Sequence, residues 1–181
     1  MTSQLSPFKF VPVIKPLPWG GRKLETFFHK ALPAGVPCGE SWEVVDLPED
    51  QSVVAEGEFA GARLADLIKS QQEELLGEVP LLQGRFPVLY KFIDVRVSLS
   101  VQVHPDARAA QQIGHGARPK TEAWYVLHAD PNAQVFLGFH NGVTHRELLA
   151  AIKADQIGAL LKPVAVHTGD FGSGIRTSDV F

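Results

Sequence analysis

The stretch Leu99-Ser100-Val101-Gln102-Val103-His104 alternates strictly between apolar and polar residues. Successive side chains on a strand leave opposite faces of a sheet, so this alternation predicts a β-strand. Its apolar residues would face a core, while the polar side chains of Gln102 and His104 would share the opposite face. Pro105-Asp106 follows directly and would end the strand in a turn.

Outside this stretch, short strands outnumber helices. Prolines disfavour helix over the first forty residues, and apolar or alternating runs predict further strands at 8–13, 41–46, 51–54, 88–94, 123–127, 133–139 and 164–167. Segments 41–46 and 51–54 could form a hairpin. Helical spacing of apolar residues predicts helical segments near 62–77 and 144–161. Thr144 and Glu147 match the capping-box pattern at the start of the second. We therefore expect a mainly β protein with two helical insertions.

Composition narrows the class of protein. The chain has 181 residues, 45% of them hydrophobic and 20% charged, which predicts one folded domain. A net charge of −3 without a dense basic block argues against nucleic-acid binding. With a single cysteine, Cys38, and with neither a signal-peptide core nor a membrane-length apolar run, we expect a cytoplasmic protein that does not bind membranes. The oligomeric state cannot be read from the sequence.

The polar face of the 99–104 segment allows two interpretations. It could simply meet solvent, as one face of many antiparallel sheets does. Alternatively, the amide oxygen of Gln102 and an imidazole nitrogen of His104 could bind a divalent metal ion, with Glu122 as a third ligand. Lys120 lies two residues before Glu122, so on a strand it would point to the same side. Taken alone, that Lys-x-Glu pair is equally consistent with a solvated edge.

Four motifs in this order resemble those of the type I phosphomannose isomerases, which are mannose-6-phosphate isomerases with a cupin fold. The resemblance covers most of the chain. Its motifs are Pro18-Trp19-Gly20-Gly21, Gly39-Glu40-Ser41-Trp42-Glu43, Pro87-Val88-Leu89-Tyr90-Lys91-Phe92-Ile93-Asp94, and Leu99-Ser100-Val101-Gln102-Val103-His104-Pro105-Asp106 followed by Lys120-Thr121-Glu122-Ala123-Trp124-Tyr125-Val126-Leu127.

The resemblance implies a cupin-type jelly-roll β-sandwich, and a zinc-dependent enzyme that interconverts mannose 6-phosphate and fructose 6-phosphate through an enediol. The roles that it implies for single residues are as follows: metal ligands Gln102, His104 and Glu122; catalytic lysines Lys91 and Lys120; substrate contacts Trp19, Glu43 and Ser100. A Lewis-acidic metal can polarise sugar oxygens, and lysines can hold a phosphate and offset enediolate charge. Manganese or cobalt would also suit these donor atoms.

The sequence departs from the family pattern after Asp170. The family has a fourth ligand, a His, in a segment that follows Gly-Asp, but here Gly169-Asp170 continues directly into Phe171-Gly172-Ser173-Gly174-Ile175-Arg176. Thr177-Ser178-Asp179 resembles a later family element, and the family's Arg beyond it has no counterpart before Phe181. We therefore expect residues 1–181 to form a single cupin-like domain that is incomplete after Asp170. Three ligands and a water can still form an open zinc site.

Two alternatives follow from this departure. The chain could be a truncated or degenerate metal-binding cupin without isomerase activity. Among the histidines, His167 is the nearest substitute for the missing ligand, but it precedes Gly169-Asp170 instead of following it. The chain could also be a different metal cupin, an oxygenase or an epimerase, but those use a His-x-His pair where this chain has Gln102-x-His104.

Overall fold

A computed structural model of the chain describes residues 6–173. The chain divides into two compact units, residues 1–99 and residues 100–181. The single domain expected from the sequence stays a prediction. The motifs at 174–176 and 177–179 lie outside the described residues.

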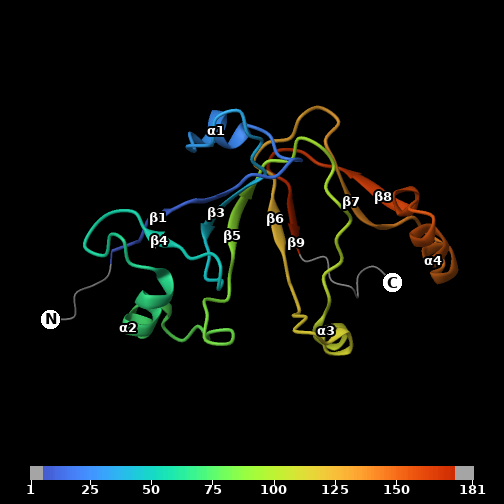
Figure 1. The fold of residues 1–181 in the computed structure, drawn as a ribbon. Coiled ribbons are helices and arrows are strands. Elements are labelled where there is room, and N and C mark those ends of the chain that lie inside the picture. Colours follow the sequence, from blue (N-terminus) through green and yellow to red (C-terminus); the bar gives the residue numbers. More distant parts are fainter. Residues whose placement is uncertain (1–5, 174–181) are drawn as a thin grey trace. The chain divides into compact units, whose positions relative to one another are not determined.

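The first unit is built on a three-stranded antiparallel sheet in the order β2-β3-β5, shown in Figure 1. A strand pair, β1-β4, and two helices complete the unit. The elements are β1 (Phe10–Val11), β2 (Val13–Lys15), α1 (Lys23–Phe28), β3 (Glu40–Val44), β4 (Val53–Val54), α2 (Leu64–Leu76) and β5 (Tyr90–Ile93).

Buried apolar residues of the first unit come from both of its helices and from its strands. Helix α2 buries Leu64, Leu67 and Ile68, whose spacing of three and four residues predicted this helix from the sequence. Other buried apolar residues of this unit are Leu24, Cys38, Val45 and Val54. Burial of each large aliphatic side chain contributes roughly 1.5–3 kcal/mol, so this set stabilises the sheet on which several predicted site residues lie.

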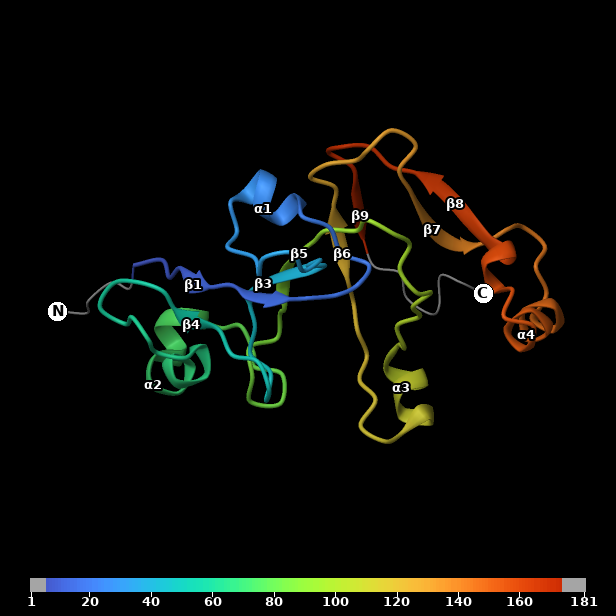
Figure 2. The same ribbon diagram turned by 45° about the horizontal axis from the view of Figure 1, so that its top comes forward.

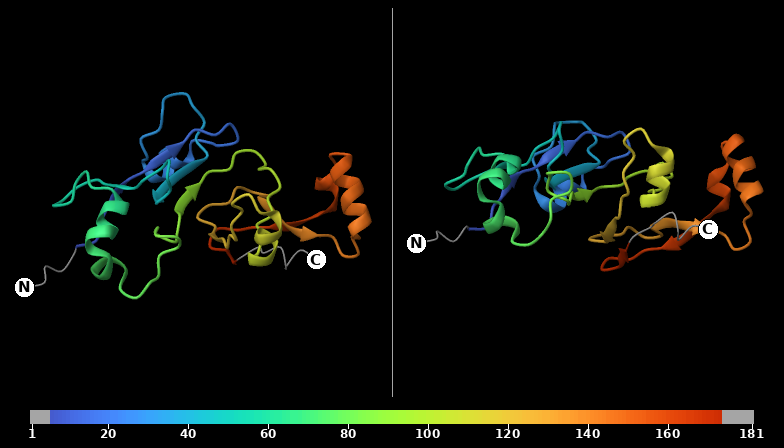
Figure 3. Two further views of the ribbon diagram at one scale, coloured as in Figure 1. Left: turned by 60° about the horizontal axis from the view of Figure 1, so that its bottom comes forward. Right: turned by 90° about the horizontal axis from the view of Figure 1, so that it is seen from below.

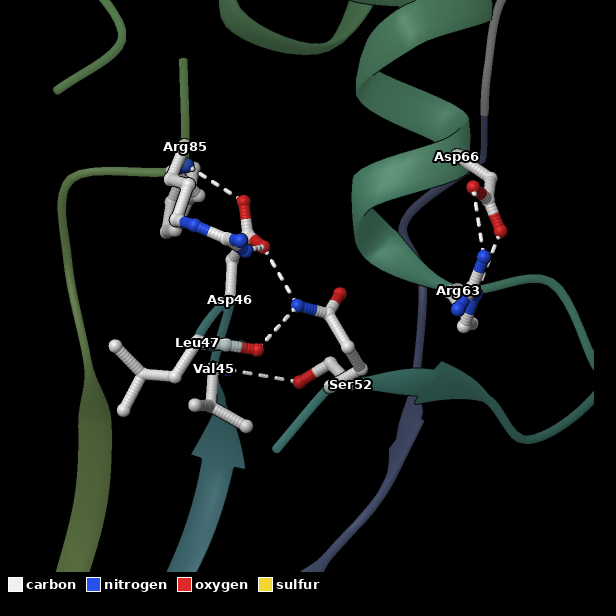
Figure 4. Close-up of polar contacts among 9 residues, drawn as sticks. Val45, Asp46, Leu47, Ser52, Arg63, Asp66 and Arg85 are labelled. Atoms are coloured by element: carbon white, nitrogen blue, oxygen red, sulfur yellow. Dashed lines mark hydrogen bonds and ion pairs between the residues drawn. The ribbon is translucent and has the colours of Figure 1, made fainter. Parts of the chain in front are cut away.

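A buried carboxylate ties the loop before β5 to the turn after β3, as Figure 4 shows. Asp46, whose side chain is 1% exposed, accepts hydrogen bonds from Arg85 Nη1 at 3.0 Å and from Gln51 Nε2 at 2.7 Å. The backbone N–H of Phe86 donates to the same carboxylate at 2.9 Å. A buried charge is tolerated when it is paired and hydrogen-bonded in this way, so the network fixes the path of the chain into β5.

The second unit contains two separate antiparallel strand pairs, β6-β9 and β7-β8. Figures 1 and 2 show β6 beside β9, and β8 beside β7 with α4 near the end of that pair. Figure 3 shows the same α4, in orange, from two other sides. The elements are α3 (Ala107–Ile113), β6 (Ala123–Tyr125), β7 (Gln134–Phe139), α4 (His145–Lys153), η1 (Ile157–Leu160), β8 (Leu161–Ala165) and β9 (Phe171–Ser173).

Local signals in the sequence account for the helices of the second unit. Helix α4 begins with the predicted capping box, in which Glu147 N–H donates to Thr144 Oγ1 at 3.3 Å and Thr144 N–H donates to Glu147 Oε2 at 2.8 Å. Helix α3 was not predicted, although Asp106 caps it by accepting a hydrogen bond from Ala109 N–H at 2.7 Å. An Asp before an alanine-rich run is itself a helix-start signal.

Three further predictions were wrong or only partly right. Residues 99–104 do not form a strand, because a strand needs a hydrogen-bonded neighbour and no described strand pairs with them. The hairpin of 41–46 with 51–54 is limited to a bridge between Asp46 and Gln51, since β4 pairs with β1 instead. Helix α1 lies where extended structure was expected, within the proline-free run 19–32.

The structure agrees with the mainly β expectation in that short strands and their pairs build both units, with helices between them. Within residues 6–173, no helix combines the length and the apolar character needed to cross a bilayer.

Candidate metal and substrate site

Three of the predicted site residues meet in the second unit. His104 Nε2 lies 2.9 Å from Glu122 Oε2, and the Lys120 ammonium lies 3.3 Å from Glu122 Oε1 and 3.4 Å from His104 Nε2. His104 precedes α3, whereas Lys120 and Glu122 precede β6. The N–H of Lys120 donates to the carbonyl of Pro105 at 3.3 Å, which holds the two segments together. The structure therefore brings His104, Lys120 and Glu122 into one cluster, and their predicted roles stay predictions.

Glu122 is the electrostatic centre of this cluster. Its partial burial raises the pKa of the carboxyl, but hydrogen bonds from His104, Lys120 and Trp124 and the positive charge of Lys120 outweigh that effect. The pKa of Glu122 consequently lies below its usual value. The side chains of His104 and Glu122 are 15% and 17% exposed, so a charged carboxylate is held in a sheltered place beside an imidazole.

The chemistry of these donors suits a divalent cation. An imidazole nitrogen and a carboxylate oxygen converge here, and both already contact one cation, the ammonium of Lys120. Gln102 is exposed, and no hydrogen bond between described residues joins it to His104 or Glu122. Among residues 6–173, no group of three or more His, Cys, Asp or Glu side chains is placed to hold a metal ion. Two of the three predicted ligands thus fit a metal by type and proximity.

Lys91, the other predicted catalytic lysine, lies in β5 of the first unit. Its ammonium lies 2.7 Å from Glu40 Oε1, and the two side chains are 18% and 13% exposed. The other oxygen of Glu40 accepts a hydrogen bond from Trp42 Nε1 at 2.6 Å. Lys91 is opposite Trp42 in the β3-β5 register, so both belong to one face of the sheet. Glu40 was not singled out from the sequence, although its spacing of two from Trp42 indicated a shared face.

Glu43, a predicted substrate contact, bonds to a different set of residues. Its carboxylate accepts hydrogen bonds from Ser41 Oγ at 2.5 Å and from Lys30 Nζ at 2.7 Å. Ser41 and Glu40 are adjacent on β3, so their side chains leave opposite faces of the sheet. Glu43, held with Ser41, therefore lies on the face opposite to Lys91 and Glu40. The structure does not bring these two predicted site residues together.

Lys30 also links α1 to the sheet face of Glu43. Its ammonium lies 5.3 Å from the centre of the Phe92 ring, against which Phe28 stacks with ring centres 4.9 Å apart. Phe28 is the last residue of α1, and Phe92 is in β5. The pair Lys30–Glu43 thus fastens the end of α1 onto the sheet.

Trp19, the third predicted site residue of the first unit, is held by a tight backbone turn. A Cβ on Gly39 would lie 2.5 Å from the indole ring, so only glycine permits this contact. The carbonyl of Trp19 accepts hydrogen bonds from the N–H groups of Arg96 at 3.0 Å and of Val97 at 3.3 Å. The indole is part-buried, and its position is fixed by backbone contacts on two sides.

Asp94 supports the same turn and was missed as a contributor. Its buried carboxylate accepts a hydrogen bond from Lys23 N–H at 2.6 Å, at the start of α1, where Arg22 supplies no side-chain cap. A Cβ on Gly21 would lie 2.7 Å from Asp94 Oδ2. The two glycines after Trp19 are therefore packing requirements, since a Cβ on Gly20 would lie 2.2 Å from the backbone nitrogen of Gly39.

Comparison with known proteins assigns the chain to a protein family. Residues 8–121 match the family model described as "Phosphomannose isomerase type I, catalytic domain". The chain belongs to this family. It is 37% identical over 166 residues to the mannose-6-phosphate isomerase ManA of Bacillus subtilis, covering 91% of this chain and 50% of that protein. It is also 37% identical over 153 residues to the mannose-6-phosphate isomerase of Streptococcus mutans, covering 84% of this chain and 46% of that protein.

One solved structure agrees with this assignment, and a second shares the fold. The crystal structure of the mannose 6-phosphate isomerase from Bacillus subtilis matches with a TM-score of 0.83 and 31% identity, over 95% of this chain and 53% of that one. A structure from Archaeoglobus fulgidus, at 23% identity, shares the fold with a TM-score of 0.77. The chain spans about half the length of the curated relatives that it matches.

The last predicted site residue, Ser100, is exposed at the start of the second unit. His167, the substitute considered for the family's fourth ligand, is in contact with Asp170, whose Oδ2 lies 3.6 Å from its Nδ1. Both side chains of that pair are at least half exposed, which is typical of a surface contact.

Proposed function

We propose that this chain interconverts mannose 6-phosphate and fructose 6-phosphate and that the reaction depends on a zinc ion. The observation that supports the proposal most directly is the cluster of His104, Lys120 and Glu122, three residues of the family motifs within hydrogen-bond or ion-pair distance of one another. A cupin jelly-roll over residues 1–181 and a cytoplasmic location are part of the same proposal, the latter supported by the free thiol of Cys38.

In this proposal His104 and Glu122, together with Gln102, hold the metal ion. When bound, a zinc ion supplies a Lewis acid beside the sugar oxygens. Because the pKa of Glu122 is lowered, its carboxylate is ionised at neutral pH and available to a cation. Manganese and cobalt are alternative occupants for the same donor set.

The lysines act on the charge of the substrate. Isomerisation moves a proton between C1 and C2 of the sugar and a second proton between the two oxygens, so negative charge develops on the enediol oxygens. Lys120, whose ammonium is 46% exposed beside the cluster, is placed to offset that charge. The family resemblance further assigns Lys91 and Ser100 to the phosphate and Trp19 and Glu43 to the sugar, although Lys91 and Glu43 lie on opposite faces of the first unit's sheet.

A coupled assay for fructose 6-phosphate, with zinc supplied, tests this proposal. We expect turnover that a chelator abolishes and zinc restores, and that is lost in K120M and in H104A. K153A, which removes an exposed lysine of α4, is the matched control and should retain activity. Zinc binding without turnover in the unaltered chain would leave a metal-binding cupin and overturn the isomerase proposal.

A second comparison concerns the two lysines on opposite sides of the first unit's sheet. We expect K91M to raise KM for mannose 6-phosphate, because an ammonium that holds the phosphate is lost. K30M should lower the free energy of unfolding, because Lys30 fastens α1 through Glu43, and should raise KM less than K91M does, because Lys30 itself has no proposed contact with the phosphate. Equal effects of the two variants on KM would contradict the assignment of Lys91 to the phosphate.

A further inference from the structure

The second unit contains a cavity that none of the proposed site residues lines. Its volume is about 350 Å³, within the range of small-molecule sites. The end of β7, the turn that follows, the first turn of α4 and one residue of β8 form its walls. The lining residues are Leu137, Gly138, Phe139, His140, Asn141, Val143, Thr144, His145, Leu148 and Lys162.

The polar part of this lining is cationic or neutral. Lys162, His140 and His145 contribute groups that are or can become positively charged, and none of the ten lining residues is acidic. Among residues 6–173, no hydrogen bond or ion pair engages the side chain of any of these three. By contrast, His128 and His167, elsewhere in the same unit, each lie close to an aspartate.

Glu147, the acidic residue in the first turn of α4, does not line the cavity. Its Oε2 accepts a hydrogen bond from Thr144 Oγ1 at 2.7 Å and one from Thr144 N–H at 2.8 Å, so its charge is engaged in the capping box. The lining itself contains the ammonium of Lys162 and no carboxylate. The balance of charge around the cavity therefore favours an anion.

We propose that this cavity binds a small phosphate group, either as free phosphate or on a small phosphorylated molecule. Lys162 would supply the permanent positive charge, and the two histidines would donate hydrogen bonds through their ring nitrogens. Leu137, Phe139 and Val143 would contact a short apolar body attached to the phosphate. The inference is independent of the cluster of His104, Lys120 and Glu122.

The test follows histidine ring proton signals by NMR in the full chain during titration with inorganic phosphate, at fixed ionic strength and near pH 6.5. We expect the signals of His140 and His145 to shift together and to saturate with a single dissociation constant. K162A should weaken binding about tenfold, the effect of losing one charge-assisted hydrogen bond. K162Q repeats the test should K162A fold poorly.

K153A is the matched control, because it removes a lysine from the last turn of α4, outside the cavity lining. Equal weakening by K153A and K162A, or unsaturable shifts that include His128 and His167, would overturn the proposal. A second titration with glycerol 3-phosphate distinguishes the two sources of the phosphate. Tighter binding than inorganic phosphate indicates a phosphorylated molecule, and equal or weaker binding indicates phosphate alone.

Discussion

His104 and Glu122 are 18 residues apart in the chain, yet their Nε2 and Oε2 atoms lie 2.9 Å from each other. In H104A and E122Q one donor of this pair is lost. Each variant should weaken zinc binding by more than the roughly 10–100-fold that loss of an outer-shell partner costs a metal site. Competition with a chromophoric chelator measures the affinity.

The second unit offers a matched control for this experiment. His128 Nε2 lies 3.0 Å from Asp130 Oδ1, a similar distance, but this pair belongs to no proposed ligand set. H128A should leave zinc affinity unchanged. A loss in H128A as large as that in H104A would show that zinc binds histidines of this unit without selection.

The buried carboxylate of Asp46 predicts a large loss of stability. D46A leaves Arg85 and the N–H of Phe86 without their acceptor, in a place where the Asp46 side chain is 1% exposed. We expect the free energy of unfolding to fall by about 3–5 kcal/mol, the cost of breaking a buried pair. Urea denaturation measures the change. D66A is the control, because the exposed pair of Asp66 with Arg63 (Figure 4) should contribute far less.

The contact between Gly21 and Asp94 predicts that the turn after Trp19 tolerates no side chain. G21A should displace the Asp94 carboxylate, on which its Cβ would impinge at 2.7 Å, and so remove the cap of α1. The expected loss is about 1–2 kcal/mol, typical of a lost helix cap. G158A, whose Cβ would meet nothing within 4 Å, should be neutral in the same thermal unfolding measurement. Equal stability of G21A and the unaltered chain would contradict the role of Asp94.

The capping box of α4 predicts a local dependence on pH. Hydrogen bonds from the backbone N–H and then from the hydroxyl of Thr144 lower the pKa of Glu147 below its usual value. A carboxyl with a lowered pKa in the folded state stabilises that state above its unfolded pKa, and the contribution is lost as pH falls through the folded value. Amide protection in α4 should therefore decrease between roughly pH 5 and pH 3. E147Q should remove this dependence, and its persistence there would assign it to another group.

Predictions from the sequence succeeded where neighbouring residues carry the signal. The spacing of Leu64, Leu67 and Ile68 and the pair Thr144 and Glu147 involve residues at most four apart, so α2 and α4 were found. The strand at 99–104 failed because alternation supplies a pattern but not a hydrogen-bonded neighbour, and that neighbour must come from elsewhere in the chain.

The same distinction applies to the candidate site. The motif resemblance assigned His104, Lys120 and Glu122 to one site, and in the structure these three side chains lie close together. It could not reveal that Lys91 pairs with Glu40, 51 residues away, or that Glu43 pairs with Lys30. Ion-pair partners at such distances depend on strand register, which is fixed only when the sheet is assembled.

Strand β3 contains a β-bulge, a shift in its register with β5 between Trp42 and Val44. This bulge determines where the strand can lose a residue. Trp42 is opposite Lys91 and Val44 is opposite Tyr90, so Glu43 is the additional residue between two otherwise consecutive pairs. A chain that lacked Glu43 would keep both pairs and would keep every later side chain on its present side. Elsewhere in the strand, removal of one residue would reverse the side chains that follow. β3 can therefore lose Glu43 without exchanging the two faces of the strand, but Lys30 would lose its ion-pair partner.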